Sequence, residues 1–192
     1  MLVNYRRSEA TGGSLVTAST ALDRLKAGNQ RFVEGNLNSE ILASPARRNN
    51  LIGDQKPFAI ILGCSDSRVP GEIIFDQGLG DLFMIRVAGN VVATSLIGSV
   101  EFAAEQFGCQ LVVVLGHSNC GAVSATLDQL QHSVEARSKN LSAIVDRISP
   151  SVEGLLESDL KDDPGALLSA AVQANIRASV RQLSQGSEVL TE

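Results

Sequence analysis

The stretch Phe58-Ala59-Ile60-Ile61-Leu62-Gly63-Cys64-Ser65-Asp66-Ser67-Arg68 joins a short apolar run to a loop that carries a thiol, a carboxylate and a guanidinium. The apolar run, residues 58–62, is too short for a helix and is rich in strand-forming residues, so it predicts a buried strand. The polar side chains at positions 64, 66 and 68 therefore follow the carboxyl end of that strand.

A second apolar run, residues 111–115, is also followed by a loop with metal-binding side chains, Gly116-His117-Ser118-Asn119-Cys120-Gly121. Predicted strands and helices alternate through the middle of the chain, which indicates a mostly parallel sheet flanked by helices. Ligands bind beyond the carboxyl ends of the strands in such sheets. We therefore expect the two loops to meet and to form one site.

The whole pattern predicts a single α/β domain over residues 19–192, with a helical C-terminal half and an N-terminal helical arm. Residues 1–18 show no periodicity, and we expect them to be an arm or a disordered lead. Thr20 and Asp23 resemble a capping box. The expected elements are a helix over 20–34, a short helix within 35–56, strands at 57–62, 81–89 and 110–115, and helices over 94–107, 120–131, 141–148 and 163–185, with Pro150 ending the third of these.

Composition excludes several classes of partner. The 192 residues carry a net charge of −5, which argues against nucleic acid or an anionic membrane as a partner. We find no apolar run near the roughly 20 residues that span a bilayer, and no secretory signal. The chain has three cysteines, and two of them lie in the polar loops. An odd count in that setting favours reduced thiols that serve a metal, and a cytoplasmic protein.

Cys64, His117 and Cys120 supply two sulfurs and one imidazole, the ligands that zinc prefers in a tetrahedral shell. His117 and Cys120 are three residues apart where a loop enters a helix, so both side chains can point at one ion. Ser118 or Asn119 can cap that helix, and its N-terminus favours the Cys120 thiolate over the thiol. We therefore predict one Zn²⁺ per chain.

Three protein ligands leave a fourth position, which catalytic zinc sites keep for water. Asp66 decides between two forms of the site. If its carboxylate binds the metal, the site is closed. If Arg68 instead holds Asp66 in a bidentate pair, the site is open and Asp66 can accept a hydrogen bond from the water. A plain surface ion pair is a third reading of these two residues.

The two loops together resemble the signature of the β-class carbonic anhydrases, and the likeness runs from about residue 20 to 190. The resemblance includes three further blocks: Gly80-Asp81-Leu82-Phe83, Arg86-Val87-Ala88-Gly89-Asn90 and Gly98-Ser99-Val100-Glu101-Phe102.

That resemblance implies the reversible hydration of CO2 to bicarbonate and a proton by zinc-bound hydroxide. Zinc would be held by Cys64, His117 and Cys120, with Asp66 and Arg68 as the dyad beside the bound water. It further implies that the protein is a homodimer or homotetramer and that Gln55 is lent across a subunit interface to bind bicarbonate. The apolar side of the pocket would be lined by Phe83, Ala88 and Phe102, whose alternative role is ordinary core packing.

The sequence departs from the family at two places. A bicarbonate-inhibited subtype has a tryptophan where this chain has Ile61, so we expect no regulatory anion site, although Arg86 matches that subtype. The family usually continues into a further apolar strand where this chain stops, at Leu190-Thr191-Glu192, so we expect either a truncated chain or a sheet edge that is closed differently. Cys109 is predicted to be a buried thiol, and His132 to lie at a helix end.

Two other functions remain open at this point. The first is a non-catalytic structural zinc protein with Asp66 as a permanent fourth ligand. The second is a sister enzyme on the same scaffold that hydrolyses another small linear molecule such as carbon disulfide.

Overall fold

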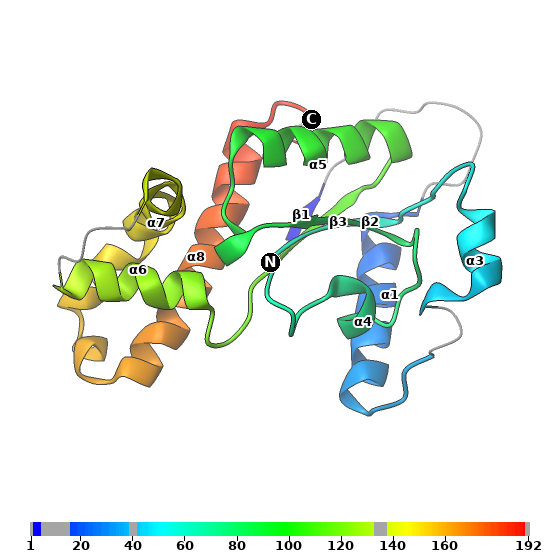
Figure 1. Ribbon diagram of the computed structural model, residues 1–192. Helices are drawn as coiled ribbons and strands as arrows, with labels where there is room; N and C mark the ends of the chain where they lie inside the picture. Colours follow the sequence, from blue (N-terminus) through cyan, green and yellow to red (C-terminus); the bar gives the residue numbers. More distant parts are fainter. Residues whose placement is uncertain (1, 5–15, 39–41, 133–137, 191–192) are drawn as a thin grey trace.

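The computed structural model describes residues 2–4, 16–38, 42–132 and 138–190, and its centre is a four-stranded sheet (Figure 1). The strand order is β1-β4-β2-β3. β2 (Ala59–Gly63) is parallel to both β3 (Leu82–Arg86) and β4 (Leu111–Leu115). All five β2 residues are buried, as expected for the central strand of a parallel sheet. The predicted mostly parallel sheet is confirmed.

The fourth strand, β1 (Leu2–Asn4), runs antiparallel to β4 and pairs Leu2 with Val113. The sequence gives no alternating pattern there, and this strand was not predicted. It pairs with the outer edge of β4, a row of backbone groups that would otherwise be exposed. Of the rest of the predicted arm, residues 1 and 5–15 lie outside the described residues, whereas Thr17 caps and Ala18 begins the helix α1 (Ala18–Val33).

Helices cover both faces of the sheet, because successive strand side chains point to opposite faces. The odd-numbered residues Ile61 and Val113 pack against α1 (Ala18–Val33). The even-numbered residues Leu62 and Val114 pack against α5 (Thr94–Phe107) and α8 (Pro164–Gly186). Two short helices, α3 (Pro45–Asn50) and α4 (Gly71–Ile74), complete this half of the molecule.

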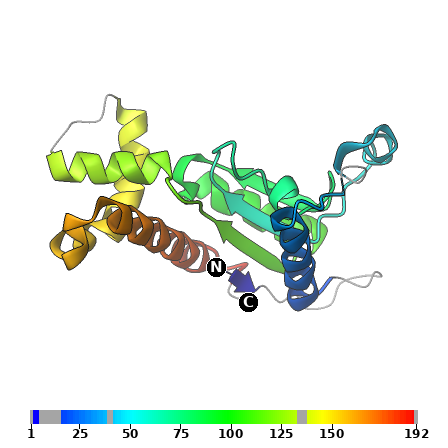
Figure 2. The same cartoon turned by 90° about the horizontal axis from the view of Figure 1, so that it is seen from below.

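The C-terminal part forms a helical lobe to one side of the sheet (Figure 2). It contains α6 (Gly121–His132), α7 (Lys139–Val152), α8 and two 3-10 helices, η2 (Glu153–Glu157) and η3 (Asp159–Asp162). As predicted, it is helical: beyond β4 the described residues contain no strand. None of the described helices is both long and apolar enough to cross a membrane.

Some helix ends follow the predicted local rules and others do not. Asp163 caps α8 with Pro164 in the first turn, and Gly108 ends α5 in a left-handed conformation, both as predicted. The cap of α1 is Thr17 rather than Thr20, whose N–H donates to the Thr17 hydroxyl. Pro150 does not end α7: the helix runs to Val152, because Ile148 and Val152 on either side of it are fully buried in the lobe.

Candidate metal centre

The two polar loops meet where β2 and β4 end side by side. Gly63, the last residue of β2, pairs with Leu115, the last residue of β4. Cys64 follows directly, and His117 and Cys120 lie between β4 and α6. The two sulfurs and an imidazole nitrogen all lie within 4.8 Å of one another. The predicted convergence of the two loops is therefore confirmed, and these atoms form a group that can hold a metal ion.

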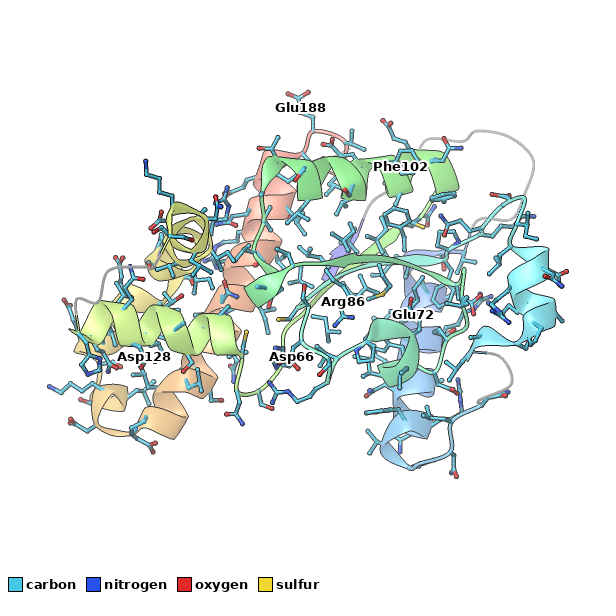
Figure 3. All side chains as sticks on the ribbon, in the orientation of Figure 1. Asp66, Glu72, Arg86, Phe102, Asp128 and Glu188 are labelled. Carbon is cyan, nitrogen blue, oxygen red and sulfur yellow. The ribbon has the colours of Figure 1, made fainter. Side chains whose placement is uncertain are left out.

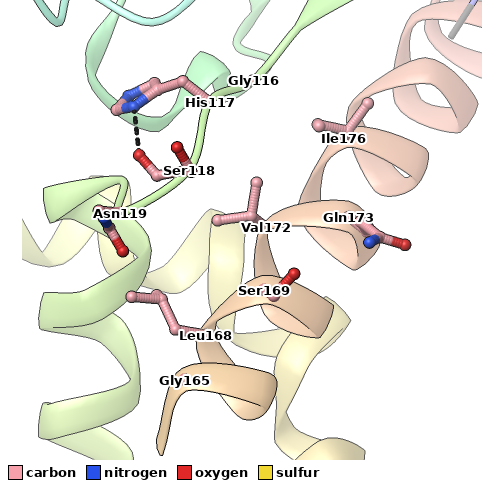
Figure 4. Close-up of a pocket in the computed structure, with 10 residues that line it drawn as sticks. All are labelled: Gly116, His117, Ser118, Asn119, Gly165, Leu168, Ser169, Val172, Gln173 and Ile176. Carbon is pink, nitrogen blue, oxygen red and sulfur yellow. Dashed lines mark hydrogen bonds between the residues drawn. The ribbon is translucent and has the colours of Figure 1, made fainter.

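The imidazole of His117 is oriented as a metal ligand. Its Nδ1 donates a hydrogen bond to the Ser118 carbonyl oxygen over 2.9 Å (Figure 4), which leaves the lone pair on Nε2. The His117 side chain is 6% exposed, and Nε2 is buried with no hydrogen-bond partner among the described residues. A buried nitrogen without a partner is costly. A metal ion would satisfy it, and histidine ligands commonly donate their other N–H to a carbonyl.

The two thiols are buried against each other and are joined by a hydrogen bond. A hydrogen bond from Cys120 lowers the pKa of Cys64 to about 4 against the effect of burial, and N–H groups of Asp66 and Gly89 add to this lowering. The same bond to Cys64, together with burial, raises the pKa of Cys120. The predicted preference of the helix N-terminus for a Cys120 thiolate is present as a contribution that lowers the pKa of Cys120, but the contact with Cys64 outweighs it.

Cys120 itself takes the place of the predicted cap of α6. Backbone N–H groups of Ala122 and Val123 point at its sulfur and act to lower its pKa, but less than the Cys64 contact raises it. Cys120 therefore caps α6 in place of the predicted capping residues, Ser118 or Asn119. Binding of a metal would displace the remaining proton, because only the thiolate is a good ligand. Two thiolates and an imidazole suit zinc and leave one position of a tetrahedron.

Asp66 and Arg68 form a bidentate ion pair at the rim of this group. Arg68 Nε donates to Asp66 Oδ1 over 2.8 Å and an Arg68 terminal nitrogen donates to Oδ2 over 2.7 Å. These bonds hold the pKa of Asp66 well below its usual range. Asp66 Oδ2 also lies 3.8 Å from His117 Nε2, and Arg68 donates to the Asn119 carbonyl. The pair thus bridges the two loops, unlike an isolated surface ion pair.

Two residues that shape the site were not predicted to do so. Arg86, at the end of β3, donates from Nε to the Cys64 carbonyl over 3.0 Å and from a terminal nitrogen to the Asp66 carbonyl over 2.6 Å (Figure 3). Gly89 donates its N–H to Cys64 Sγ over 3.4 Å. Both lie in the block Arg86–Asn90 that the sequence analysis quoted only for its resemblance. This block was the signal in the sequence from which the roles of Arg86 and Gly89 could have been found.

Four residues predicted to line the substrate pocket divide into two groups. Ala88 lies in η1 (Ala88–Asn90), next to Gly89 and the metal ligands. Gln55 lies before β2, in a hollow shared with Gly80 and Phe107. Phe83 and Phe102 pack with their ring centroids 6.2 Å apart, and Phe83 packs on the core between the sheet and α5. Gln55, Phe83 and Phe102 are therefore not gathered around the metal-binding group within one chain.

A second hollow of about 280 Å³ lies on the other side of the His117 loop, against α8 (Figure 4). Both apolar and polar side chains of α8 line it, and residues 116–119 line it from the other side. It is lined by Gly116, His117, Ser118, Asn119, Gly165, Leu168, Ser169, Val172, Gln173 and Ile176.

Comparisons with known proteins find carbonic anhydrases. A family model described as carbonic anhydrase matches residues 59–192. Carbonic anhydrase of Mycolicibacterium smegmatis is 46% identical over 130 residues, which cover 67% of this chain and 61% of that protein. Carbonic anhydrase 2 of Mycobacterium tuberculosis is 45% identical over 128 residues, with the same coverage. This chain thus spans about three fifths of the length of these relatives.

Solved structures share the fold. The β-carbonic anhydrase CcaA superimposes with a TM-score of 0.65 and 26% identity over 88% of this chain and 76% of that one. A tetrameric β-carbonic anhydrase of Sordaria macrospora also gives a TM-score of 0.65, at 21% identity over 90% of this chain and 82% of that one.

Proposed function

This chain belongs to the β-carbonic anhydrase family, and we propose on that basis that it catalyses the reversible hydration of CO2 to bicarbonate and a proton. The observation that carries the proposal is the group of Cys64, His117 and Cys120, whose ligand atoms lie within 4.8 Å of one another. The partnerless, buried Nε2 of His117 supports a metal at this place. We assign the metal as one Zn²⁺ per chain.

Zinc bound by these three residues would supply the Lewis acidity that makes a water molecule nucleophilic at neutral pH. The chain's own contribution is to fix the direction of attack. Asp66 has one carboxylate oxygen near His117 Nε2 and both oxygens engaged by Arg68. We assign Asp66 Oδ2 to accept a hydrogen bond from the attacking water, which orients its lone pair toward CO2. Arg68 keeps that carboxylate ionised and away from the metal position.

The alternative is a closed, structural site with Asp66 as fourth ligand. The bidentate Arg68 pair argues against it, because turning the carboxylate onto the metal would break charge-assisted bonds to Arg68. Carbon disulfide would use the same ligands, so it is tested as a second substrate in the same assay.

The direct test is stopped-flow CO2 hydration by the zinc-loaded protein across pH, with zinc content measured on the same samples. Cys64→Ser should lose zinc and activity together. Cys109→Ser is the matched control, because Cys109 is equally buried but donates to the Pro57 carbonyl, far from the metal ligands in the fold. A zinc-replete protein without CO2 hydration even under alkaline conditions would refute the proposed activity.

We further propose that the active protein is a homodimer or homotetramer. Gln55 lies before the amino end of β2 and Cys64 after its carboxyl end, so the five residues of the strand put about 17 Å between them. This separation supports a role for Gln55 at the metal centre of another subunit. Phe102 is 54% exposed, although its ring packs on Phe83 and Phe107, which supports a covered surface in the assembly.

Mixed assemblies test whether Gln55 acts across the interface. The Gln55→Ala and Cys64→Ser variants are each expected to be inactive alone. Equal amounts of the two variants are mixed, unfolded and refolded together. If Gln55 serves the partner, each mixed dimer contains one complete site, and activity returns to about a quarter of the wild-type value. If Gln55 serves its own chain, mixing restores no activity.

We place the protein in the cytoplasm, because all three cysteines are free thiols in the structure.

A further inference from the structure

The C-terminal helix α8 carries two buried polar side chains, Asn175 and Ser179. Asn175 is 2% exposed and Ser179 is 1% exposed. They are four positions apart, so they lie one above the other on the same face of the helix. Burying an amide and a hydroxyl is costly unless both are hydrogen-bonded. The hydrogen-bond partners of Asn175 and Ser179 therefore indicate the role of these two residues.

Both side chains bind the same short turn, η1. Asn175 Nδ2 donates to the Gly89 carbonyl over 2.7 Å, and the Ser179 hydroxyl donates to the Asn90 carbonyl over 2.9 Å. The Asn90 side-chain amide donates back to Ser179 Oγ over 3.4 Å. In the fold, α8 thus donates hydrogen bonds to two consecutive backbone carbonyls of η1, although more than 80 residues separate donors and acceptors in the sequence.

This turn cannot hold its shape through local preference alone. Gly89 has φ 68° and Asn90 has φ 45°, two consecutive residues in the left-handed region. A Cβ at Gly89 would lie 3.0 Å from both Ala122 and Ile148 side-chain atoms. Bonds from outside the turn are needed to select this conformation over the many that the free segment could adopt.

The conformation of the turn places a donor on the metal-binding group. The Gly89 N–H donates to Cys64 Sγ over 3.4 Å, while the Gly89 carbonyl accepts from Asn175. One residue therefore links α8 to a predicted metal ligand, with its acceptor on the helix side and its donor on the sulfur side. An N–H directed at a thiolate orients the sulfur and withdraws charge from it, which is how groups outside the ligand shell tune a metal site.

We propose that Asn175, supported by Ser179, is a positioning residue of the metal centre that acts through Gly89 on Cys64. This inference rests on the proposed metal site but not on the reaction that the site performs. Its consequence is that the C-terminal helical lobe, and not only the sheet, sets how tightly the centre holds its metal.

The test uses Asn175→Leu in the full chain, which keeps the branching at Cγ but removes the donor. Zinc affinity is measured by competition with a chromophoric chelator, and cobalt(II) replaces zinc to report the thiolate-to-metal absorption band. We expect zinc affinity to fall by about 10–100-fold and the cobalt band to shift. Ser179→Ala should change both in the same direction by less, because it removes only the neighbouring bond.

Two control variants on α8 separate positioning from general loosening of the helix. Ser184→Ala removes a hydroxyl that donates only to the Val180 carbonyl within the helix. Leu183→Ala opens the core below the helix without touching η1. Neither should shift the cobalt band of the folded protein.

Wild-type affinity and an unshifted band in Asn175→Leu would overturn the inference, as would an equal shift in Leu183→Ala. If Asn175→Leu fails to fold, Ser179→Ala decides alone, and an unchanged band in that variant overturns the inference. A wild-type chain that binds no zinc would instead refute the metal site, and a chain that binds zinc without CO2 hydration would refute only the proposed activity.

Discussion

At the scale of single residues, the chemistry of the site depends on how Arg68 uses its donors. It engages both oxygens of Asp66 and also the Asn119 carbonyl of the other loop. Asp66 therefore stays ionised well below neutral pH and cannot turn toward the metal position without breaking two charge-assisted bonds.

Asp66→Asn separates binding of the metal from turnover. The amide keeps the shape of the carboxylate but loses its charge and one acceptor, so zinc should remain bound while CO2 hydration falls by about 100-fold or more. Stopped-flow hydration and zinc analysis on the same sample measure both. Asp128→Asn, an exposed carboxylate on α6, is the control and should have wild-type turnover. Activity of Asp66→Asn within twofold of the wild type would remove Asp66 from its assigned role.

At the scale of elements, α1 is fixed to the sheet layer by its close contact with the segment after α4. Gly28 lies where a Cβ would meet the Phe75 carbonyl oxygen at 1.6 Å, so the helix and that segment touch backbone to backbone. Arg31 pairs with Asp76, and the Asn38 N–H donates to the same carboxylate. Sequence periodicity predicted α1, but this contact partner was not predictable.

Gly28→Ala tests the close approach. The new methyl group has no space beside the Phe75 backbone, so we expect a loss of roughly 1–3 kcal/mol in the free energy of unfolding. Gly98→Ala is the matched control: Gly98 lies in α5 with nothing within 4 Å of its Cβ position. It should gain roughly 0.5–1 kcal/mol from helix propensity. Urea denaturation measures both, and equal effects would show that α1 can shift freely.

Asp76 predicts a pH dependence of stability. Burial raises its pKa, but the bonds from Arg31 and Asn38 outweigh burial and hold the pKa below its usual value. The unfolded chain therefore takes up this proton at a higher pH than the folded chain. The stabilisation is fully present above the unfolded pKa of about 4, and it is lost as the pH falls through the folded pKa.

Comparison of wild type with Asp76→Asn by urea denaturation tests this dependence. The wild type should be the more stable protein at pH 7, and the difference should shrink as the pH falls below about 4. A difference that is independent of pH would show that the charge of Asp76 is not what stabilises the contact.

At the scale of the whole molecule, the metal-binding group joins the sheet to the helical lobe. Cys64 follows β2, whereas Cys120 precedes α6, and both pack in the cluster that contains Ile148 and Val152 of α7. An ion bound there would bridge the two parts and bind only the folded chain, since the unfolded chain does not bring these ligands together.

Zinc removal should therefore lower the thermal midpoint of the whole chain. With free zinc at 1,000 times its dissociation constant, the expected stabilisation is about 4 kcal/mol. Differential scanning calorimetry with added zinc, and after chelation, measures the shift. His117→Ala should abolish the response, whereas Cys109→Ser should keep it. A midpoint that does not respond to zinc in the wild type would contradict the bridging role.

Local patterns were sufficient for much of this protein. Apolar runs at residues 58–62 and 111–115 predicted the two strands, and Gly108 and Asp163 predicted helix ends, because strand burial and helix capping act over a few residues. The ligand set followed as well, since residues after the ends of parallel strands must share one edge. The sequence alone therefore determined the fold class and the three side chains of the candidate metal centre.

Only the tertiary structure decided which distant groups complete those side chains. The bonds from Arg86 to the Cys64 loop and from Asn175 to Gly89 join residues 22 and 86 positions apart, and no local pattern marks them. The strand β1 and the passage of α7 through Pro150 were likewise settled by what lies beside them in the fold. The physical reason is that a buried polar group or a helix end is stabilised by its neighbours in space, which the order of residues along the chain does not specify.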